Sequence, residues 1–313
     1  SFQDNFIDGA SIYLDKDGVD ALPLVVDPLM LYYNKTLLSN AGIASPPVYW
    51  DELFNLNDKL TKKRTDGTVT QSMIALGAYT NITNAKDIIS MFLIQSGNPI
   101  TIRKNGQILV DFNQDKSLST SINDESIKFF TEFSNPLGSA YSWNRGLIES
   151  KNLFTGNNLV FYIGHSSELF DIQDVNPNLS FDVAEILQVR NDNTKRTVGD
   201  VYAIAINKNS KNLTGAFGVA YSLSSSKYID LISKALSLPP ALKASLLVNP
   251  TDPYLYSFYK TSISLHTWLD PDNEATDEIF ARFVENVISG RASISDALNR
   301  LQSEIGLLIT NTL

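Results

Sequence analysis

Cysteine is absent from this 313-residue chain, and histidine occurs only twice, as His165 and His266. The lack of cysteine excludes disulfide cross-links, zinc sites built on thiolates and a cysteine nucleophile. The two histidines are far apart in sequence, which does not favour a His-rich metal site. The acidic stretches at 15–20 and 270–278 lack the ordered ligands of a calcium loop, and we interpret them as a turn and a helix start. We therefore expect no metal and no cofactor.

Concentrated positive charge and long apolar runs are also missing. The net charge is -9, and the short KKR at 62–64 is the only cluster of basic residues. Nucleic acids and anionic membrane surfaces require a basic face, so neither is expected as a partner. No run of about 18 apolar residues could span a bilayer. Residues 1–10 lack the features of a signal peptide, and Ser1 stands where Met would begin a chain, so we expect a processed or truncated start.

The residues that are present predict an α/β fold. Hydrophobic residues make up 43% and charged residues 19%, the balance of a globular protein with about two domains. Short apolar segments alternate with longer helical patterns. The patterns predict strands at 22–26, 158–164 and 201–209, helices at 50–61, 85–98, 124–134 and 146–156, a hairpin at 100–112 around Asn105-Gly106, and a helix pair at 274–309.

Motifs of nucleophilic catalysis and nucleotide binding are not found. The chain has no G-x-S-x-G, no P-loop and no G-x-G-x-x-G. The segment GHSSE at 164–168 brings Gly, His, Ser and Glu together, but a triad is assembled in space rather than by adjacency in sequence. We interpret this segment as a turn from a strand into a helix, and we assign no catalytic residue.

Aromatic residues at the ends of predicted elements suggest a different chemistry. Trp143, Tyr202 and Trp268 each stand beside polar residues. A sugar ring has an apolar C–H face and a rim of hydroxyls, so it suits a pocket with one or two rings and a few polar groups. Asp27, Asn81 and Arg145 are candidates for the polar part. For any single aromatic residue, a place in the core or at its rim is the alternative.

The stretch from 22 to 53 resembles a known signature. LPLVVDPLMLYYNKTLLSNAGI, followed by ASPPVYWDEL, is similar to the signature segment of the family 1 extracellular solute-binding proteins, the cargo receptors of ABC importers for sugars. The residues that carry the resemblance are Pro23, Asp27, Tyr33-Asn34-Lys35, Ala41-Gly42, Pro46-Pro47 and Trp50-Asp51-Glu52-Leu53. Later segments follow in family order, and the last helices surround Ser-Gly-Arg at 289–291.

The resemblance implies two α/β lobes of the type II periplasmic-binding-protein fold, joined by hinge crossovers. It assigns residues 1–26 plus 203–262 to a partial N-terminal lobe, and residues 28–200 plus 265–313 to the C-terminal lobe. Family members carry more residues before the signature segment than this chain does. We therefore expect the N-terminal lobe to be truncated here.

The resemblance also implies a binding site, with Asp27 at the first crossover accepting hydroxyls and Asn81 on a C-lobe loop. Trp143 and Tyr202 are stacking candidates, Ser166 and His165 are polar contacts, and Trp268 completes the set. The implied partners are a mono- or oligosaccharide and the permease subunits of an ABC importer. The implied protein is a monomer outside the cytoplasm, in the periplasm or at the cell surface, and any lipid anchor would lie upstream of Ser1.

Two other functions stay open from the residues alone. A glycoside hydrolase would need a second carboxylate beside Asp27, flanking the bound ring, and the sequence does not reveal one. A binding protein for a peptide, a polyamine or a metal chelate is the other alternative. The acidic composition keeps a cationic cargo open.

Overall fold

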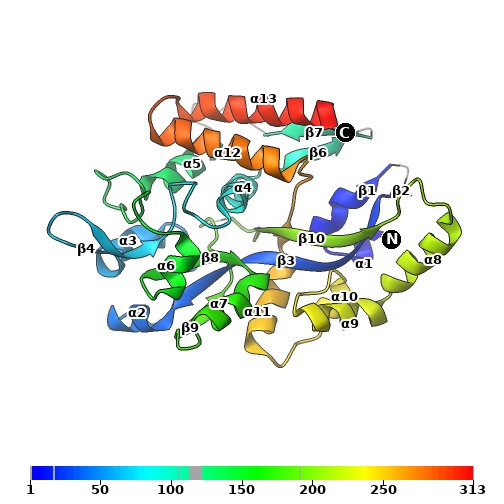
Figure 1. Cartoon of the computed structure of the whole chain (residues 1–313), viewed down its shortest axis with the longest axis horizontal. Coiled ribbons are helices and arrows are strands. Elements are labelled where there is room, and N and C mark those ends of the chain that lie inside the picture. The colour runs from blue at the N-terminus through cyan, green and yellow to red at the C-terminus, as the bar shows by residue number, and fades with distance from the viewer. Residues whose placement is uncertain (1, 17, 105, 113–121, 191, 313) are drawn as a thin grey trace.

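The computed structural model describes residues 2–16, 18–104, 106–112, 122–190 and 192–312 (Figure 1). The helices are α1 (Phe2–Asn5), α2 (Lys35–Asn40), α3 (Glu52–Leu60), α4 (Ala85–Gln95), α5 (Ile122–Glu132), α6 (Ser150–Thr155), α7 (Leu169–Val175), α8 (Leu213–Leu223), α9 (Ser226–Leu236), α10 (Lys243–Leu246), α11 (Pro253–Ser262), α12 (Asn273–Ile288) and α13 (Ile294–Thr312), with 3-10 turns η1 (Asp8–Tyr13) and η2 (Ser166–Glu168). The strands are β1 (Leu14–Asp15), β2 (Gly18–Val19), β3 (Ala21–Asn34), β4 (Lys62–Lys63), β5 (Val69–Ile74), β6 (Ile100–Lys104), β7 (Gln107–Asp111), β8 (Leu159–His165), β9 (Phe181–Ala184), β10 (Thr197–Ala205) and β11 (Leu265–His266). The predicted α/β class is confirmed.

Strand β3 runs through the middle of the molecule and organises the main sheet (Figure 1). Within the described residues the sheet has the order β11-β10-β3-β8-β5-β4, with β9 also paired to β3. The first half of β3 pairs antiparallel with β10, as far as Pro28 opposite Gly199. The second half pairs antiparallel with β8, starting with Leu29 opposite His165. Strand β3 therefore changes its partner between Pro28 and Leu29, next to Asp27.

The sequence patterns located several of these elements. Strand β3 contains the predicted strand at 22–26 and continues beyond it, and β8 agrees with 158–164. Strand β10 begins four residues before the predicted 201, so that it includes Asp200. Strands β6 and β7 form the predicted hairpin. Asn105 at its turn lies outside the described residues.

Buried apolar side chains form two separate clusters. The larger cluster contains the second half of β3 from Leu29 on, together with β8 and helices α4, α12 and α13. The smaller cluster consists of Phe6, Ile7, Ala10, Val26, Ile229, Ala241, Leu246 and Leu265. Val26 and Leu29 belong to different clusters, so β3 passes from one core to the other around Asp27. Phe258 of α11 packs into the larger cluster.

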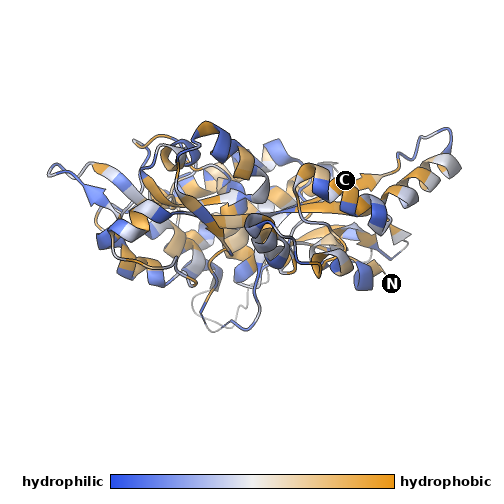
Figure 2. Cartoon of the chain, turned by 90° about the horizontal axis from the view of Figure 1, so that it is seen from below, coloured by the Kyte–Doolittle hydropathy of each residue, from blue (hydrophilic) through white to orange (hydrophobic). Residues whose placement is uncertain are grey.

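Helix α8 presents apolar side chains to solvent. Leu213, Phe217, Val219 and Tyr221 are all more than half exposed, and Ala220 is its one buried residue. In Figure 1 this helix lies at the right edge of the molecule, and Figure 2 shows hydrophobic residues on the helix at that end. This end of the molecule therefore presents several apolar side chains to solvent.

Candidate functional site

A polar cavity of about 530 Å³ opens where β3 changes its partner. We call it the central cleft. Its walls come from β3, β10, the end of β8, the first turn of α4 and the segment leading into α12. The lining residues are Asp27, Asn84, Lys86, Asp87, Lys151, His165, Ser167, Glu168, Val198, Gly199, Asp200, Tyr202, Thr267, Trp268, Asp270 and Asn273.

The Asp27 carboxylate is held by the turn that follows β8. Asp27 is 2% exposed, and its Oδ1 accepts hydrogen bonds from Ser166 Oγ (2.7 Å) and the Ser167 backbone N–H (2.9 Å). Strand β8 ends beside Asp27 because Leu29 and His165 are directly paired, so the next turn points its donors at the carboxylate. A buried carboxylate with two donors does not bear the full cost of an unpaired charge.

His165 bridges β3 and α4. Its Nδ1 lies 3.0 Å from the backbone oxygen of Asp27, and its Nε2 lies 3.0 Å from Asp87 Oδ2. A carbonyl and a carboxylate both accept, so only the doubly protonated ring satisfies both contacts. Burial alone would lower the pKa of His165, but the bond to Asp87 and the nearby charges of Asp87, Asp27 and Asp200 raise it to about 10. His165 is therefore an imidazolium at neutral pH.

Glu168 fixes the rim of the cleft on the side of β8. Its carboxylate accepts hydrogen bonds from Asn84 Nδ2 (2.7 Å), Tyr162 OH (2.6 Å) and the His165 backbone N–H (2.8 Å). Lys151 forms an ion pair with it at 3.2 Å. These partners occupy Glu168 within the protein, so its main effect is to orient the turn that presents Ser166 and Ser167 to Asp27.

Lys86 fixes the opposite rim. Its ammonium group lies 2.7 Å from Asp270 Oδ2, donates to Thr276 Oγ1 (3.2 Å) and also contacts Asn273. These contacts connect the first turn of α4 to the start of α12. Trp268 stands just before this junction, is 7% exposed and packs against Phe280 with ring centroids 6.1 Å apart. Trp268 is therefore a largely buried residue that also lines the cleft.

Strand β10 contributes Asp200 and Tyr202. Asp200 is directly opposite Asp27 in the antiparallel pairing, and Tyr202 is 48% exposed. Burial raises the pKa of the Asp200 carboxyl; Asp87 and Asp27 add to this rise, while His165 opposes it. Gly199 lets the strands approach closely, because a Cβ there would lie 2.3 Å from the Asp27 backbone oxygen.

Four of the seven site residues expected from the sequence line the central cleft, namely Asp27, His165, Tyr202 and Trp268. Ser166 is buried beside it and donates to Asp27. The sequence did not single out Lys86, Asp87, Lys151, Glu168 or Asp200. For Asp200, its position one residue after Gly199 at a strand start was an available signal. The others depend on contacts between distant segments.

Asn81 and Trp143 lie elsewhere, and the structure differs here from the sequence expectation. Trp143 is fully buried, and its Nε1 donates to Asn81 Oδ1 at 3.0 Å. The Asn81 amide nitrogen donates to the backbone oxygens of Asn144 (2.9 Å) and Leu147 (3.0 Å). Both side chains hold the loop before α6 in place. A fully buried indole leaves no ring face for a sugar, so we do not carry these two residues into the site.

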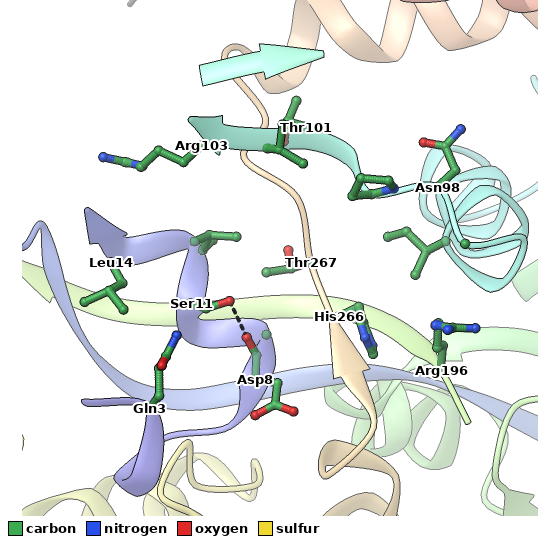
Figure 3. Close-up of a pocket in the computed structure, with 16 residues that line it drawn as sticks. Gln3, Asp8, Ser11, Leu14, Asn98, Thr101, Arg103, Arg196, His266 and Thr267 are labelled. Atoms are coloured by element: carbon green, nitrogen blue, oxygen red, sulfur yellow. Dashed lines mark hydrogen bonds between the residues drawn. The ribbon is translucent and has the colours of Figure 1, made fainter. Parts of the chain in front are cut away.

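A second cavity, of about 490 Å³, adjoins the segment after β11, and Thr267 of this segment lines both cavities (Figure 3). Residues from η1, including Asp8 and Ser11, form one wall, and Thr101 and Arg103 of β6 form the other. Arg103 at its edge forms ion pairs with Asp15 (3.2 Å) and Asp20 (2.7 Å). Asp27 does not line this cavity, which makes the central cleft the better candidate site.

In the part of the chain that the structure describes, no group of three or more histidine, aspartate or glutamate side chains is arranged to hold a metal ion. No described helix combines the length and the apolar character needed to cross a bilayer.

The fold and a cleft at a strand crossover define the class of protein. Three solved structures illustrate the likeness. The cyclic alpha-maltosyl-1,6-maltose binding protein from Arthrobacter globiformis is 18% identical, with a TM-score of 0.72, and the match covers 99% of this chain and 77% of that one. A cyclo/maltodextrin-binding protein complexed with maltotetraose is 16% identical, with a TM-score of 0.73 and coverage of 97% and 74%. The maltose/maltodextrin-binding domain MalE from Bdellovibrio bacteriovorus, bound to maltotriose, is 17% identical, with a TM-score of 0.66 and coverage of 99% and 77%. The two-lobe fold of these proteins is shared by this chain.

The family follows from the sequence. Residues 2–254 match the model of the bacterial extracellular solute-binding proteins, and the chain belongs to that family. The resemblance noted in the signature segment is thereby confirmed. No match was found among curated proteins.

Proposed function

We propose that this protein captures a mono- or oligosaccharide in the central cleft and delivers it to the permease subunits of an ABC importer. The observation that carries the proposal is the Asp27 carboxylate, which is held by Ser166 and Ser167 and lines a polar cavity. Charged acceptors form strong hydrogen bonds with hydroxyl donors. Support also comes from the structural neighbours, two of which were solved with maltotetraose and maltotriose bound.

The side chains around Asp27 suit a sugar ring. Tyr202 exposes about half of its surface, and the largely buried Trp268 lines the same cavity. An aromatic ring covers the apolar face of a sugar, and carboxylates and ammonium groups bind its hydroxyls. Asp87, Lys86 and Asn84 supply further polar atoms on the wall formed by α4. His165 contributes indirectly, by fixing the backbone of Asp27.

A hinge motion accompanies binding in this proposal. Residues 1–26 and 203–262 form one lobe, residues 28–200 and 265–313 form the other, and β3, β10 and residues 263–264 join them. The separation of the two buried clusters at Asp27 supports this division, although Phe258 packs with the larger cluster and Leu265 with the smaller one. A ligand shifts the population toward the closed state only if it binds that state better. Asp27 and Asp200 at the join would contact the ligand from both strands.

We also propose that the protein is a monomer outside the cytoplasm. The proposed function is tested by titrating the purified protein with a panel of mono- and oligosaccharides. Tryptophan fluorescence reports on the cleft through Trp268, and calorimetry gives the stoichiometry. We expect saturable binding of one ligand per chain. Absence of heat and fluorescence change with every saccharide would overturn the proposal.

A glycoside hydrolase is the second candidate, because Asp27 and Asp200 form a pair of carboxylates that faces the cleft. Glycosidases use two carboxyl groups on either side of the scissile bond. We favour binding without catalysis, since the family consists of solute-binding proteins. Release of a chromophore from an aryl glycoside by the wild type, and its loss in Asp27→Asn, would reverse this preference.

A further inference from the structure

Two carboxylates stand directly opposite each other on the same face of the sheet. Asp27 on β3 and Asp200 on β10 are paired in the antiparallel register, and both line the central cleft. Residues opposite each other in such a pair have Cα atoms about 4.5–5.5 Å apart and point to the same side. The side chains of such a pair are neighbours, so two negative charges placed there repel each other. The arrangement is therefore unfavourable unless something in the cleft compensates it.

The other acidic residues of the cleft have cationic partners. Asp87 contacts the His165 imidazolium at 3.0 Å, Glu168 contacts Lys151 at 3.2 Å, and Asp270 contacts Lys86 at 2.7 Å. These pairs neutralise three carboxylates within the protein. They also occupy the three cations of the cleft, so none of these is left to serve Asp27 or Asp200 at a comparable distance.

Asp27 and Asp200 lack such a partner among the residues that the structure describes. Both hydrogen bonds to Asp27 come from neutral donors, Ser166 and Ser167, and both end on Oδ1. Its Oδ2 receives no hydrogen bond from the described part of the chain, although the side chain is 2% exposed and lines the cavity. Asp200 forms neither a hydrogen bond nor an ion pair with a described side chain, and it is exposed to the cleft.

The neighbouring groups respond to this negative charge. Tyr202 stands two residues after Asp200 on the same strand; burial raises the pKa of its phenol, and the charges of Asp27 and Asp200 raise it further. The same two carboxylates help to keep His165 protonated. A ligand group placed between Asp27, Asp200 and the Tyr202 ring would meet two negative charges and one aromatic face.

We propose that the Asp27–Asp200 pair makes the cleft selective for a saccharide that carries a protonated amino group. The inference rests on the proposed saccharide-binding function and deepens it. Neutral hydroxyls can donate to both carboxylates, but they leave both charges in place. An ammonium group donates three hydrogen bonds, neutralises one charge and can rest against the Tyr202 ring. Closure of the cleft removes water and strengthens this attraction.

The test compares two disaccharides with one skeleton. Chitobiose, built from two glucosamine units, carries amino groups, and N,N′-diacetylchitobiose carries neutral amides at the same positions. Calorimetric titrations are made with the wild type, with Asp200→Asn and with Asp230→Asn, an exposed residue of α9 that does not line the cleft. Each titration is repeated at low salt and at about 0.5 M salt, where charge interactions are screened.

We expect the wild type to prefer chitobiose by at least about tenfold, the effect of one close charge pair in a partly solvated site. High salt should reduce the preference, Asp200→Asn should lose most of it, and Asp230→Asn should keep it. Equal affinities for the two disaccharides, or a preference that Asp200→Asn leaves unchanged, would overturn the inference but not the saccharide-binding function. If the wild type bound spermidine and none of the neutral or amino saccharides tested, the saccharide-binding function itself would be overturned, and this inference with it.

Discussion

His165 and Asp27 are bound to each other through the backbone: the imidazole Nδ1 of His165 lies 3.0 Å from the backbone oxygen of Asp27. The two residues that follow His165 bind the Asp27 carboxylate from the other side. The last residue of β8 and the turn after it therefore fix both the main chain and the side chain of Asp27. The position of this carboxylate is set before any ligand enters.

Protonation of His165 makes stability depend on pH. Its pKa is about 10 in the folded protein, against about 6.5 in an unfolded chain. Because the folded value is the higher one, the stabilisation is fully present below about pH 6.5 and is lost as the pH rises through about 10. The groups that face this ring are Asp87 of α4 and Asp27 and Asp200 of the paired strands.

The variant His165→Gln isolates this effect. We expect it to lower the free energy of unfolding by a few kcal/mol near pH 6, with the difference from the wild type shrinking toward pH 10. Urea unfolding of both proteins across this range gives the measurement. A difference that stays constant with pH would contradict a charged His165.

Removal of the Asn81 side chain should destabilise the protein without changing ligand affinity. Asn81→Ala leaves the Trp143 indole N–H and two backbone oxygens without their partner. An unsatisfied buried polar group costs about 1–3 kcal/mol. Thermal unfolding measures the loss, and calorimetry with a bound saccharide tests the affinity. A large loss of affinity in a folded variant would show that Asn81 belongs to the binding site.

A side chain at Gly199 should disturb the join between β3 and β10. The Cβ of Gly199→Ala would lie 2.3 Å from the Asp27 backbone oxygen and 2.7 Å from the Pro28 Cα. Overpacking of this kind costs about 1–3 kcal/mol, and here the strands must move apart at the binding carboxylate. We expect both a lower melting temperature and weaker saccharide binding. Gly218→Ala on α8, where a Cβ meets no atom within 4 Å, serves as the control.

Tyr202 should contribute to affinity through its ring. Tyr202→Ala is expected to weaken saccharide binding roughly three- to tenfold, which corresponds to one aromatic contact of moderate strength. Tyr256→Ala is the matched control, because Tyr256 is 46% exposed against 48% for Tyr202 and does not line the cleft. If both substitutions changed the dissociation constant equally, Tyr202 would not be part of the binding site.

From the sequence we expected Asp27, His165 and Ser166 at the site. Asp27 was assigned through the signature segment at 22–53, and His165 and Ser166 follow the apolar residues of the predicted strand at 158–164. Strand periodicity locates positions such as His165 and Ser166, because a buried strand must end where its apolar residues end. The order of the sheet then places the end of β8 beside the middle of β3, at the central cleft.

Other residues could not be assigned from the sequence. Lys86 and Asp87 look like ordinary polar residues in the first turn of a helix, and only contacts with Asp270 and His165 place them in the cleft. Trp143 follows a loop and resembles an exposed aromatic residue. Its backbone N–H donates to the Phe133 backbone oxygen at 3.0 Å, so the loop folds back and buries the indole. These outcomes depend on tertiary packing that local patterns do not encode.

The central claim is that Asp27 is the carboxylate that binds saccharide hydroxyls, and Asp27→Asn tests it most directly. The substitution keeps the size of the side chain and removes its charge. Hydrogen bonds to a charged acceptor stabilise a complex more than hydrogen bonds to a neutral one. The measurement is the dissociation constant for the best saccharide of the panel, by calorimetry, for the wild type, Asp27→Asn and the surface control Asp230→Asn. We predict a loss of at least about tenfold for Asp27→Asn alone, with the fold retained by circular dichroism. An Asp27→Asn protein that is folded and binds that saccharide as tightly as the wild type would contradict the account.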